Sequence, residues 1–287
     1  MDRRLDRRAF LAASGAALAG LALPRARAAT SPGAGRLKQS VSRWPYQRIP
    51  LPEFCRRAKE IGLVAIDLLQ PDEWPVVQDA GLVPSMGYPS RRRDFIATGF
   101  NHPANHAMLL GELEAAIPLA AAAGVPNVIA MFGNREGVSD AHGVANCVVG
   151  LSRIKALAEE RGVTVCVELL NSKVDHQDYQ GDRTVFGAEV VRSVGSPRVK
   201  LLYDIYHMQI MEGDVIRTIR ENIEWIAHFH TGGVPGRHEL DDGQELNYRA
   251  VAAAIADLGF EGYVAHEFVP TRDPLTSLAE AVKLCEV

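Results

Sequence analysis

Four residues that can carry a proton or bind a metal ion stand where apolar segments of the chain end. Three are carboxylates and one is an imidazole, with spacings of 36, 26 and 37 residues: Glu168, Asp204, His230 and Glu267. Three carboxylates that converge without a cation repel one another and raise one another's pKa. A divalent ion would balance them, and this mixed donor set suits Mn, Mg, Co or Zn equally. The sequence therefore predicts one divalent ion, while for each residue alone a helix cap or an ion pair stays open.

His207 and Arg237 are candidates for binding a substrate. His207 lies three residues after Asp204, so its imidazole can reach the same place, although a loop cap is an alternative. Arg237 lies seven residues after His230, and a guanidinium can grip a carboxylate with two parallel hydrogen bonds. A pair with Glu239 or Asp241 inside the same loop is the competing interpretation. A nearby pair of glycines, 232–233, is only a weak indication of a phosphate site and equally suits a tight turn.

Short apolar segments alternate with helical patterns along the chain. Several segments are continuous and β-branched, as strands that are covered on both faces should be. The predicted strands are 37–41, 63–69, 82–86, 125–132, 163–170, 199–204, 225–230 and 262–268. The clearest helical patterns each end close to a glycine stop signal: 105–123, 144–160 and 248–258.

This alternation predicts one α/β domain, a (β/α)8 TIM barrel over residues 29–287. The carboxyl ends of barrel strands meet at one mouth, where barrel active sites form, so the four strand-end residues are expected to converge. No G-x-G-x-x-G follows the first predicted strand, which weakens a dinucleotide-binding alternative.

Residues 1–28 have the pattern of a twin-arginine signal peptide. Arg7 and Arg8 precede an apolar run over 9–23, and Ala26-Arg27-Ala28 is a small-residue cleavage pattern. The run is too short to span a membrane, and a basic amphipathic helix is the alternative. We expect cleavage after residue 28 and a periplasmic or otherwise exported protein.

Charge and cysteine content exclude several classes of protein. Removing residues 1–28 takes Lys+Arg from 31 to 25, Asp+Glu from 35 to 33 and the net charge from −4 to −8. An acidic protein repels polyphosphate, which argues against a nucleic-acid partner. The four cysteines are widely spaced without C-x-x-C, so buried free thiols are expected rather than zinc or disulfides. We therefore expect the chain to act on a small molecule, and a homo-oligomer stays open.

Several motifs resemble the hydroxypyruvate isomerase family, a branch of the xylose-isomerase-like barrels. They are Glu168-Leu169-Leu170-Asn171-Ser172-Lys173, Asn134-Arg135-Glu136-Gly137, Tyr203-Asp204-Ile205-Tyr206-His207-Met208, the segment 230–239 and His266-Glu267-Phe268. The resemblance implies a metal-assisted isomerase whose two catalytic glutamates are Glu168 and Glu267. The implied reaction interconverts hydroxypyruvate and tartronate semialdehyde (2-hydroxy-3-oxopropanoate) through an enediolate.

Other functions stay open on the same residues. Some hydroxypyruvate isomerases have glutamine where this chain has His230, and histidine there is more similar to the ketose 3-epimerases of the superfamily. A ketose 3-epimerase or a keto-polyol isomerase or dehydratase is therefore the alternative. A non-catalytic periplasmic protein that binds sugar acids is a different class. A metal-dependent endonuclease of the same superfamily would need a basic groove, which a net charge of −8 disfavours.

Overall fold

Eight parallel strands form the centre of the computed structural model, which describes residues 35–287. The predicted signal peptide lies outside the described residues. The strands are β1 (Lys38–Ser42), β2 (Ala65–Asp67), β3 (Val83–Pro84), β4 (Asn127–Met131), β5 (Thr164–Leu169), β6 (Val199–Asp204), β7 (Ile226–Thr231) and β8 (Tyr263–His266). Their order in the sheet is β3-β2-β1-β8-β7-β6-β5-β4, and every pair is parallel.

The sheet closes on itself at Gly87, between β3 and β4. The N–H of Gly87 donates to the Asn127 carbonyl over 2.9 Å, and its own carbonyl accepts from the Ile129 N–H over 3.1 Å. A glycine suits this closure because a Cβ there would lie 2.7 Å from the Trp74 ring. The predicted (β/α)8 barrel is therefore confirmed.

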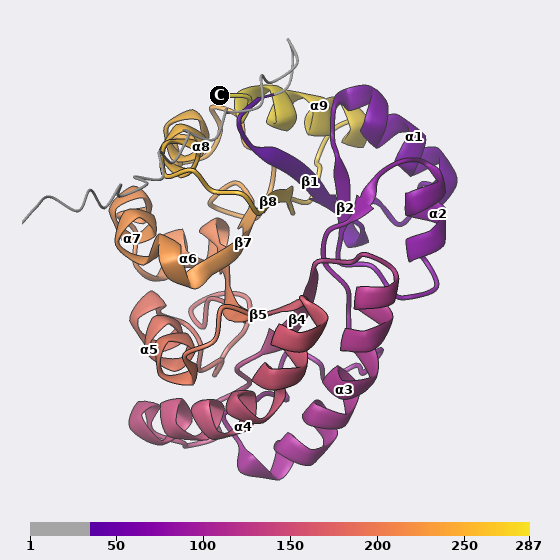
Figure 1. The fold of residues 1–287 in the computed structure, drawn as a ribbon. Helices are drawn as coiled ribbons and strands as arrows, with labels where there is room; N and C mark the ends of the chain where they lie inside the picture. Colours follow the sequence, from indigo (N-terminus) through magenta and orange to yellow (C-terminus); the bar gives the residue numbers. More distant parts are fainter. Residues whose placement is uncertain (1–34) are drawn as a thin grey trace, which may run out of the picture. The chain divides into compact units, whose positions relative to one another are not determined.

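The helices form a ring around the strands (Figure 1). They are α1 (Leu51–Ile61), α2 (Trp74–Asp79), α3 (His106–Ala122), α4 (Asp140–Arg161), α5 (Thr184–Val194), α6 (Ile205–Met211), α7 (Val215–Asn222), α8 (Tyr248–Asp257) and α9 (Pro274–Leu284). Short 3-10 turns occupy Trp44–Tyr46, Pro103–Asn105 and Ile223–Trp225. Among the described residues no helix is long and apolar enough to cross a membrane.

The three helical patterns read from the sequence correspond to α3, α4 and α8, and all eight strands lie within or overlap their predicted ranges. The bounds differ most at β2 and β3, where predictions of seven and five residues shrink to Ala65–Asp67 and Val83–Pro84. Trp225 belongs to a 3-10 turn rather than to β7, and β8 ends at His266, so Glu267 follows the strand. Apolar residues continue past the ends of β2 and β3 because the loops that follow these strands also pack into the hydrophobic core.

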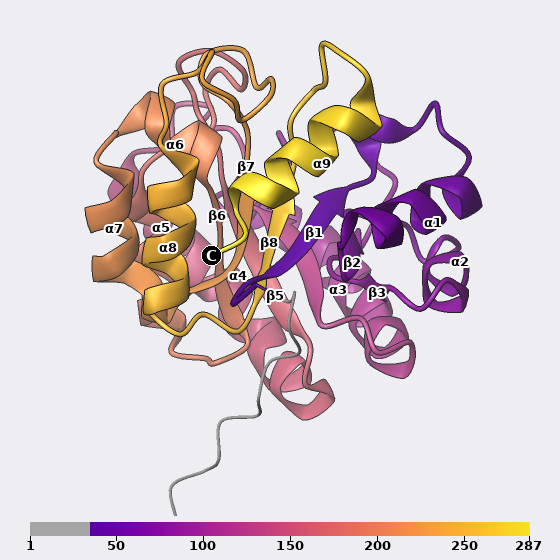
Figure 2. The same ribbon diagram turned by 90° about the horizontal axis from the view of Figure 1, so that it is seen from above.

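Strand register gathers the strand-end side chains at one end of the barrel. Asp204 on β6 is paired in register with His230 on β7, and the neighbouring Thr231 is paired with His266, directly before Glu267. Glu168 on β5 pairs with Leu202 on β6. In Figure 2 the long loops that follow β7 and β8 rise from this same end. The fold thus positions three of the candidate residues on the adjacent strands β5, β6 and β7 and the fourth, Glu267, directly after β8.

Candidate metal centre

The four predicted metal ligands converge. Each offers one donor atom, and these atoms all lie within 4.8 Å of one another: Glu168, Asp204, His230 and Glu267. All four side chains are buried. Nδ1 of His230 is the central atom, because it lies 3.2 Å from Glu168 Oε1, 2.5 Å from Glu267 Oε2 and 3.9 Å from Asp204 Oδ2.

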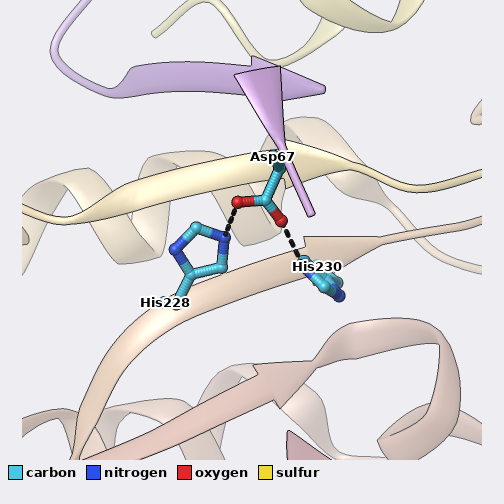
Figure 3. Close-up of side chains that lie close together, drawn as sticks. All are labelled: Asp67, His228 and His230. Atoms are coloured by element: carbon cyan, nitrogen blue, oxygen red, sulfur yellow. Dashed lines mark hydrogen bonds and ion pairs between the residues drawn. The ribbon is translucent and has the colours of Figure 1, made fainter. Parts of the chain in front are cut away.

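The other nitrogen of His230 faces away from this cluster, toward a residue that the sequence did not single out. Nε2 lies 2.7 Å from Oδ2 of Asp67, the last residue of β2 (Figure 3). The second oxygen of Asp67 lies 3.2 Å from Nε2 of His228, two residues before His230 on β7. All three side chains are fully buried.

Arg237 points into the barrel mouth rather than along its own loop. Its Nη2 lies 2.6 Å from Asp204 Oδ2 and also donates to Glu267 Oε2, and its Nε donates to the Glu267 carbonyl over 2.9 Å. The predicted alternative partner Glu239 instead accepts hydrogen bonds from the loop after β8. The structure therefore places Arg237 beside the metal-ligand candidates.

His207 lies at the start of α6, and both of its ring nitrogens contact neighbouring side chains. Its backbone N–H donates to Asp204, which caps this helix, over 3.2 Å. Nδ1 lies 2.7 Å from Nδ2 of Asn171, whose own Oδ1 accepts from two backbone N–H groups and so fixes the orientation of the amide. Nε2 lies 2.8 Å from Nη1 of Arg237.

Burial and charge shift these groups in different directions. Burial raises the pKa of Glu168, and the hydrogen bond and charge of His230 offset only part of the effect. Burial alone would also raise the pKa of Glu267, but the charges of His230 and Arg237 outweigh this effect and lower the pKa of that carboxyl. Burial and the nearby charge of Arg237 hold the pKa of His207 well below its ordinary value, so this imidazole is neutral near pH 7.

The charges of the cluster fit a divalent cation. Four buried carboxylates, those of Glu168, Asp204, Glu267 and Asp67, face three groups that can be cationic, Arg237, His230 and His228. Even with both histidines protonated, the ionised set carries one uncompensated negative charge, which is costly in a buried place. Oxygen and imidazole donors within 4.8 Å are also the ligand chemistry of Mn, Mg, Co or Zn sites. The residues present therefore fit the predicted ion.

A cavity of 1140 Å³ opens above the cluster at the carboxyl ends of the strands. Glu168, Glu267, His207 and Arg237 line it, together with aromatic side chains that include Trp44, which donates to Glu267 Oε1 over 2.5 Å. Such a concave site with few converging polar groups is typical of small-molecule binding.

The structure settles two smaller expectations. All four cysteines, Cys55, Cys147, Cys166 and Cys285, are buried free thiols, as predicted. The glycines at 232–233 serve a close backbone contact, because Gly233 N–H donates to the His238 carbonyl over 2.9 Å.

Two residues of the site were missed by the sequence reasoning. Asp67 carried the same signal as the others, a polar residue that ends an apolar strand, but the predicted strand 63–69 ran past it. Asn171 gave no comparable signal, because its role depends on two backbone N–H groups in the loop after β5.

Comparison with known proteins adds relatives of similar length. The family model described as "Xylose isomerase-like TIM barrel" matches residues 38–286. A human protein named "Putative hydroxypyruvate isomerase" is 28% identical over 260 residues, which cover 89% of this chain and 86% of the relative. A "2-oxo-tetronate isomerase" from Cupriavidus necator is 38% identical over 113 residues, covering 39% of this chain and 43% of the relative.

Solved structures share the fold. A structure described as AP endonuclease, family 2, from Brucella melitensis superposes with a TM-score of 0.77 at 22% identity, covering 86% of this chain and 99% of the other. The 3-keto-D-glucoside 4-epimerase of E. coli superposes with a TM-score of 0.72 at 16% identity, covering 87% and 98%. At these identities the likeness shows the barrel fold alone.

Proposed function

Since this chain belongs to the xylose isomerase-like TIM-barrel family, we propose that it is a metal-assisted isomerase of a small hydroxy-keto acid. The reaction we propose interconverts hydroxypyruvate and tartronate semialdehyde through an enediolate. The observation that carries the proposal is the buried convergence of Glu168, Asp204, His230 and Glu267 beneath an open cavity. Relatives named as hydroxypyruvate and 2-oxo-tetronate isomerases support the same class of reaction.

The two glutamates supply the proton transfers of the proposed reaction. A C–H next to a carbonyl is a weak acid, and a divalent ion at this site would polarise the carbonyl and stabilise the oxyanion that forms. One glutamate takes the proton from C3, and the other returns a proton to C2 as a general acid. The proton of the C3 hydroxyl passes to the C2 oxygen, so that C3 becomes the carbonyl carbon and C2 carries the hydroxyl. Both Glu168 and Glu267 line the cavity, so each carboxyl can reach a bound substrate.

In the proposed reaction His207 and Arg237 hold the substrate oxygens. Both side chains line the cavity, and Nη1 of Arg237 lies 2.8 Å from Nε2 of His207, so a substrate carboxylate can contact both residues. Because His207 is neutral, the charge at this position comes from Arg237.

A ketose 3-epimerase or keto-polyol isomerase is the second candidate, and the cavity favours it. Sites for drug-sized ligands enclose roughly 300–1,000 Å³. The 1140 Å³ found here leaves most of the space beside a three-carbon acid unfilled. A longer ketose would contact more of the wall, and the same two glutamates would move its proton.

A substrate panel with an arginine variant separates the candidates. The wild type and Arg237→Lys are assayed with Mn on hydroxypyruvate and on neutral ketoses. For hydroxypyruvate we expect kcat/KM to fall by a factor that corresponds to about 1.5–3 kcal/mol, because an ammonium cannot form two parallel bonds to the carboxylate. Neutral ketoses should change little.

The other outcomes have definite meanings. Faster turnover of neutral ketoses by the wild type, with both substrates affected alike by Arg237→Lys, would favour the epimerase. Binding of sugar acids without turnover of any substrate, in protein that contains its metal, would favour the non-catalytic binding protein.

We further propose that residues 1–28 direct export through the twin-arginine route. The support is the sequence pattern alone: Arg7-Arg8, an apolar run and Ala26-Arg27-Ala28. Replacing both arginines by lysine should keep the precursor inside the cell, and N-terminal sequencing of the exported protein should begin near Ala29. An exported form that begins at Met1 would contradict cleavage.

A further inference from the structure

We propose that Asp67 is a positioning residue that orients His230 for metal binding. The inference deepens the proposed function and rests on its metal site, since it concerns how one of the four donors is held. Asp67 contacts Nε2 of His230, the nitrogen that faces away from the four converging donors (Figure 3), and it does not line the cavity.

The contacts of Asp67 use both of its oxygens. Oδ2 lies 2.7 Å from His230 Nε2, which is a short, charge-assisted hydrogen bond. Oδ1 accepts from the Ser85 hydroxyl over 2.8 Å, and that hydroxyl lies 2.7 Å from the hydroxyl of Ser40. The carboxylate is fully buried and ends strand β2, which β1 and β8 separate from β7, so it is held in place from another part of the barrel wall.

This hydrogen bond decides which nitrogen of His230 is available. A neutral imidazole carries one N–H, and a carboxylate at Nε2 keeps the proton there. Nδ1 then has a free lone pair, and Nδ1 is the atom that faces the three carboxylates. Carboxylates that hold metal-binding histidines in this way typically strengthen metal affinity by 10–100-fold.

A second metal ion held by Asp67, His228 and His230 is the competing interpretation, since their donor atoms also lie close together. The surroundings disfavour it. None of these three side chains lines the cavity, and one carboxylate beside two histidines carries no excess negative charge that a further cation would have to balance.

The test measures metal binding without substrate. Full-length Asp67→Ala, Asp67→Asn, His230→Ala and Ser42→Ala proteins are stripped of metal and titrated with Mn²⁺ by calorimetry. Ser42 is the matched control, because it is buried, pairs in register with Asp67 on the neighbouring strand, and its hydroxyl has no partner among the described residues. Asp67→Ala should bind Mn²⁺ 10–100-fold more weakly, and Ser42→Ala should match the wild type.

Asp67→Asn keeps an acceptor oxygen near Nε2 without the charge, so it should restore part of the affinity and bind about three- to tenfold more weakly than wild type. The ¹⁵N resonances of His230 in the Zn²⁺-loaded protein supply a second readout that general destabilisation would not change. In wild type and Asp67→Asn the proton should be on Nε2, and in Asp67→Ala the resonance should shift.

Each contrary result points to a different error. If both Asp67 variants bind Mn²⁺ within twofold of wild type while His230→Ala loses binding, the metal site stands and the role of Asp67 is wrong. If Asp67→Ala does not fold, unchanged affinity in Asp67→Asn overturns the inference by itself. Two Mn²⁺ per wild-type chain would make Asp67 a ligand and also overturn it. Unchanged binding in His230→Ala would overturn the proposed metal site.

Discussion

Glu168 and Glu267 reach the candidate site in different electrostatic surroundings. Glu267 receives hydrogen bonds from Trp44 and Arg237 and contacts His230. Among residues 35–287, the carboxylate of Glu168 has one side-chain hydrogen-bond partner, His230 at 3.2 Å. The pKa of Glu267 is lowered by these charges, and that of Glu168 is raised by burial. Two carboxyls with diverging pKa values at one site are typical of an acid and base pair.

Replacing either glutamate by glutamine should abolish most turnover. Glutamine preserves the shape of the side chain but cannot exchange a proton, so Glu168→Gln and Glu267→Gln should each lower kcat at least ~100-fold. Glu245→Gln, on an exposed part of the loop after β7, is the control and should be near wild type. Metal content is measured for each variant, and near-full kcat in Glu168→Gln would disprove the two-glutamate mechanism.

A site residue could be predicted from the sequence where a polar side chain directly ends an apolar strand. Glu168, Asp204 and His230 each stand near the end of an apolar strand, and barrel geometry then brings them together. Asp67 had the same signal, but its strand is so short that apolar residues continue beyond it. For Arg237 the sequence left two orientations open, toward the substrate or toward Glu239, because the choice depends on the partners that Glu239 finds in the loop after β8.

At the scale of elements, the loop between β7 and α8 determines where Arg237 lies. Its backbone folds back in an antiparallel bridge between Gly233 and His238, and Arg237 has a positive φ of 58°. A Cβ at Gly233 would lie 2.2 Å from the Glu239 carbonyl oxygen. The loop therefore depends on this glycine for a close backbone approach.

Gly233→Ala should displace Arg237 without removing the metal ligands. A misplacement of about 1 Å at a substrate-binding group can cost ~100-fold in rate. We expect a loss of that size in kcat/KM, with Mn²⁺ affinity near wild type because the four donors come from strand ends. Gly111→Ala on α3, where a Cβ meets no atom within 4 Å, is the control. Full activity in Gly233→Ala would show that the bridge does not position Arg237.

Glu239 ties this loop to the one after β8. Its buried carboxylate accepts from the N–H groups of Thr271 and Arg272 and from the hydroxyls of Thr271 and Ser277. Burial alone would raise the pKa of Glu239, but these hydrogen bonds outweigh it and lower the pKa to about 2. A carboxyl whose pKa is lowered in the folded state stabilises the fold when it is ionised.

The stability contributed by Glu239 should therefore disappear in acid. It is fully present above the ordinary glutamate pKa of 4.5 and is lost as the pH falls from there toward about 2. Near pH 7, Glu239→Gln should lower the free energy of unfolding by about 2 kcal/mol, measured by urea denaturation. At about pH 3 the difference in the free energy of unfolding between wild type and Glu239→Gln should be smaller. An equal difference at pH 7 and pH 3 would contradict a stabilising role of the ionised Glu239. Glu114→Gln, on the exposed face of α3, is the control.

At the scale of the whole barrel, most of the architecture was predictable from alternation alone. Strand and helix patterns repeat often enough that the parallel closed sheet follows from their order. The closure at Gly87 was not predictable, because it rests on a single residue beyond a two-residue strand. The size of the cavity was also hidden, since it is set by how the loops at the mouth fold over it.

The excess negative charge buried at the centre of the barrel should make its stability depend on a divalent ion. Ligand that binds only the folded state stabilises it by about 2.7 kcal/mol at a hundredfold excess over Kd. For a barrel of this size that corresponds to a rise in Tm of roughly 5–10 °C. We expect this rise when Mn²⁺ is added to metal-stripped protein, reversal by chelator, and one ion per chain by elemental analysis.

His230→Ala removes a central donor and should show little rise in Tm, whereas Ser42→Ala should behave as wild type. If the Tm of the metal-stripped wild type does not respond to Mn, Mg, Co or Zn, the metal-assisted mechanism is wrong. Arg237 and protonated carboxyls would then balance the buried charge.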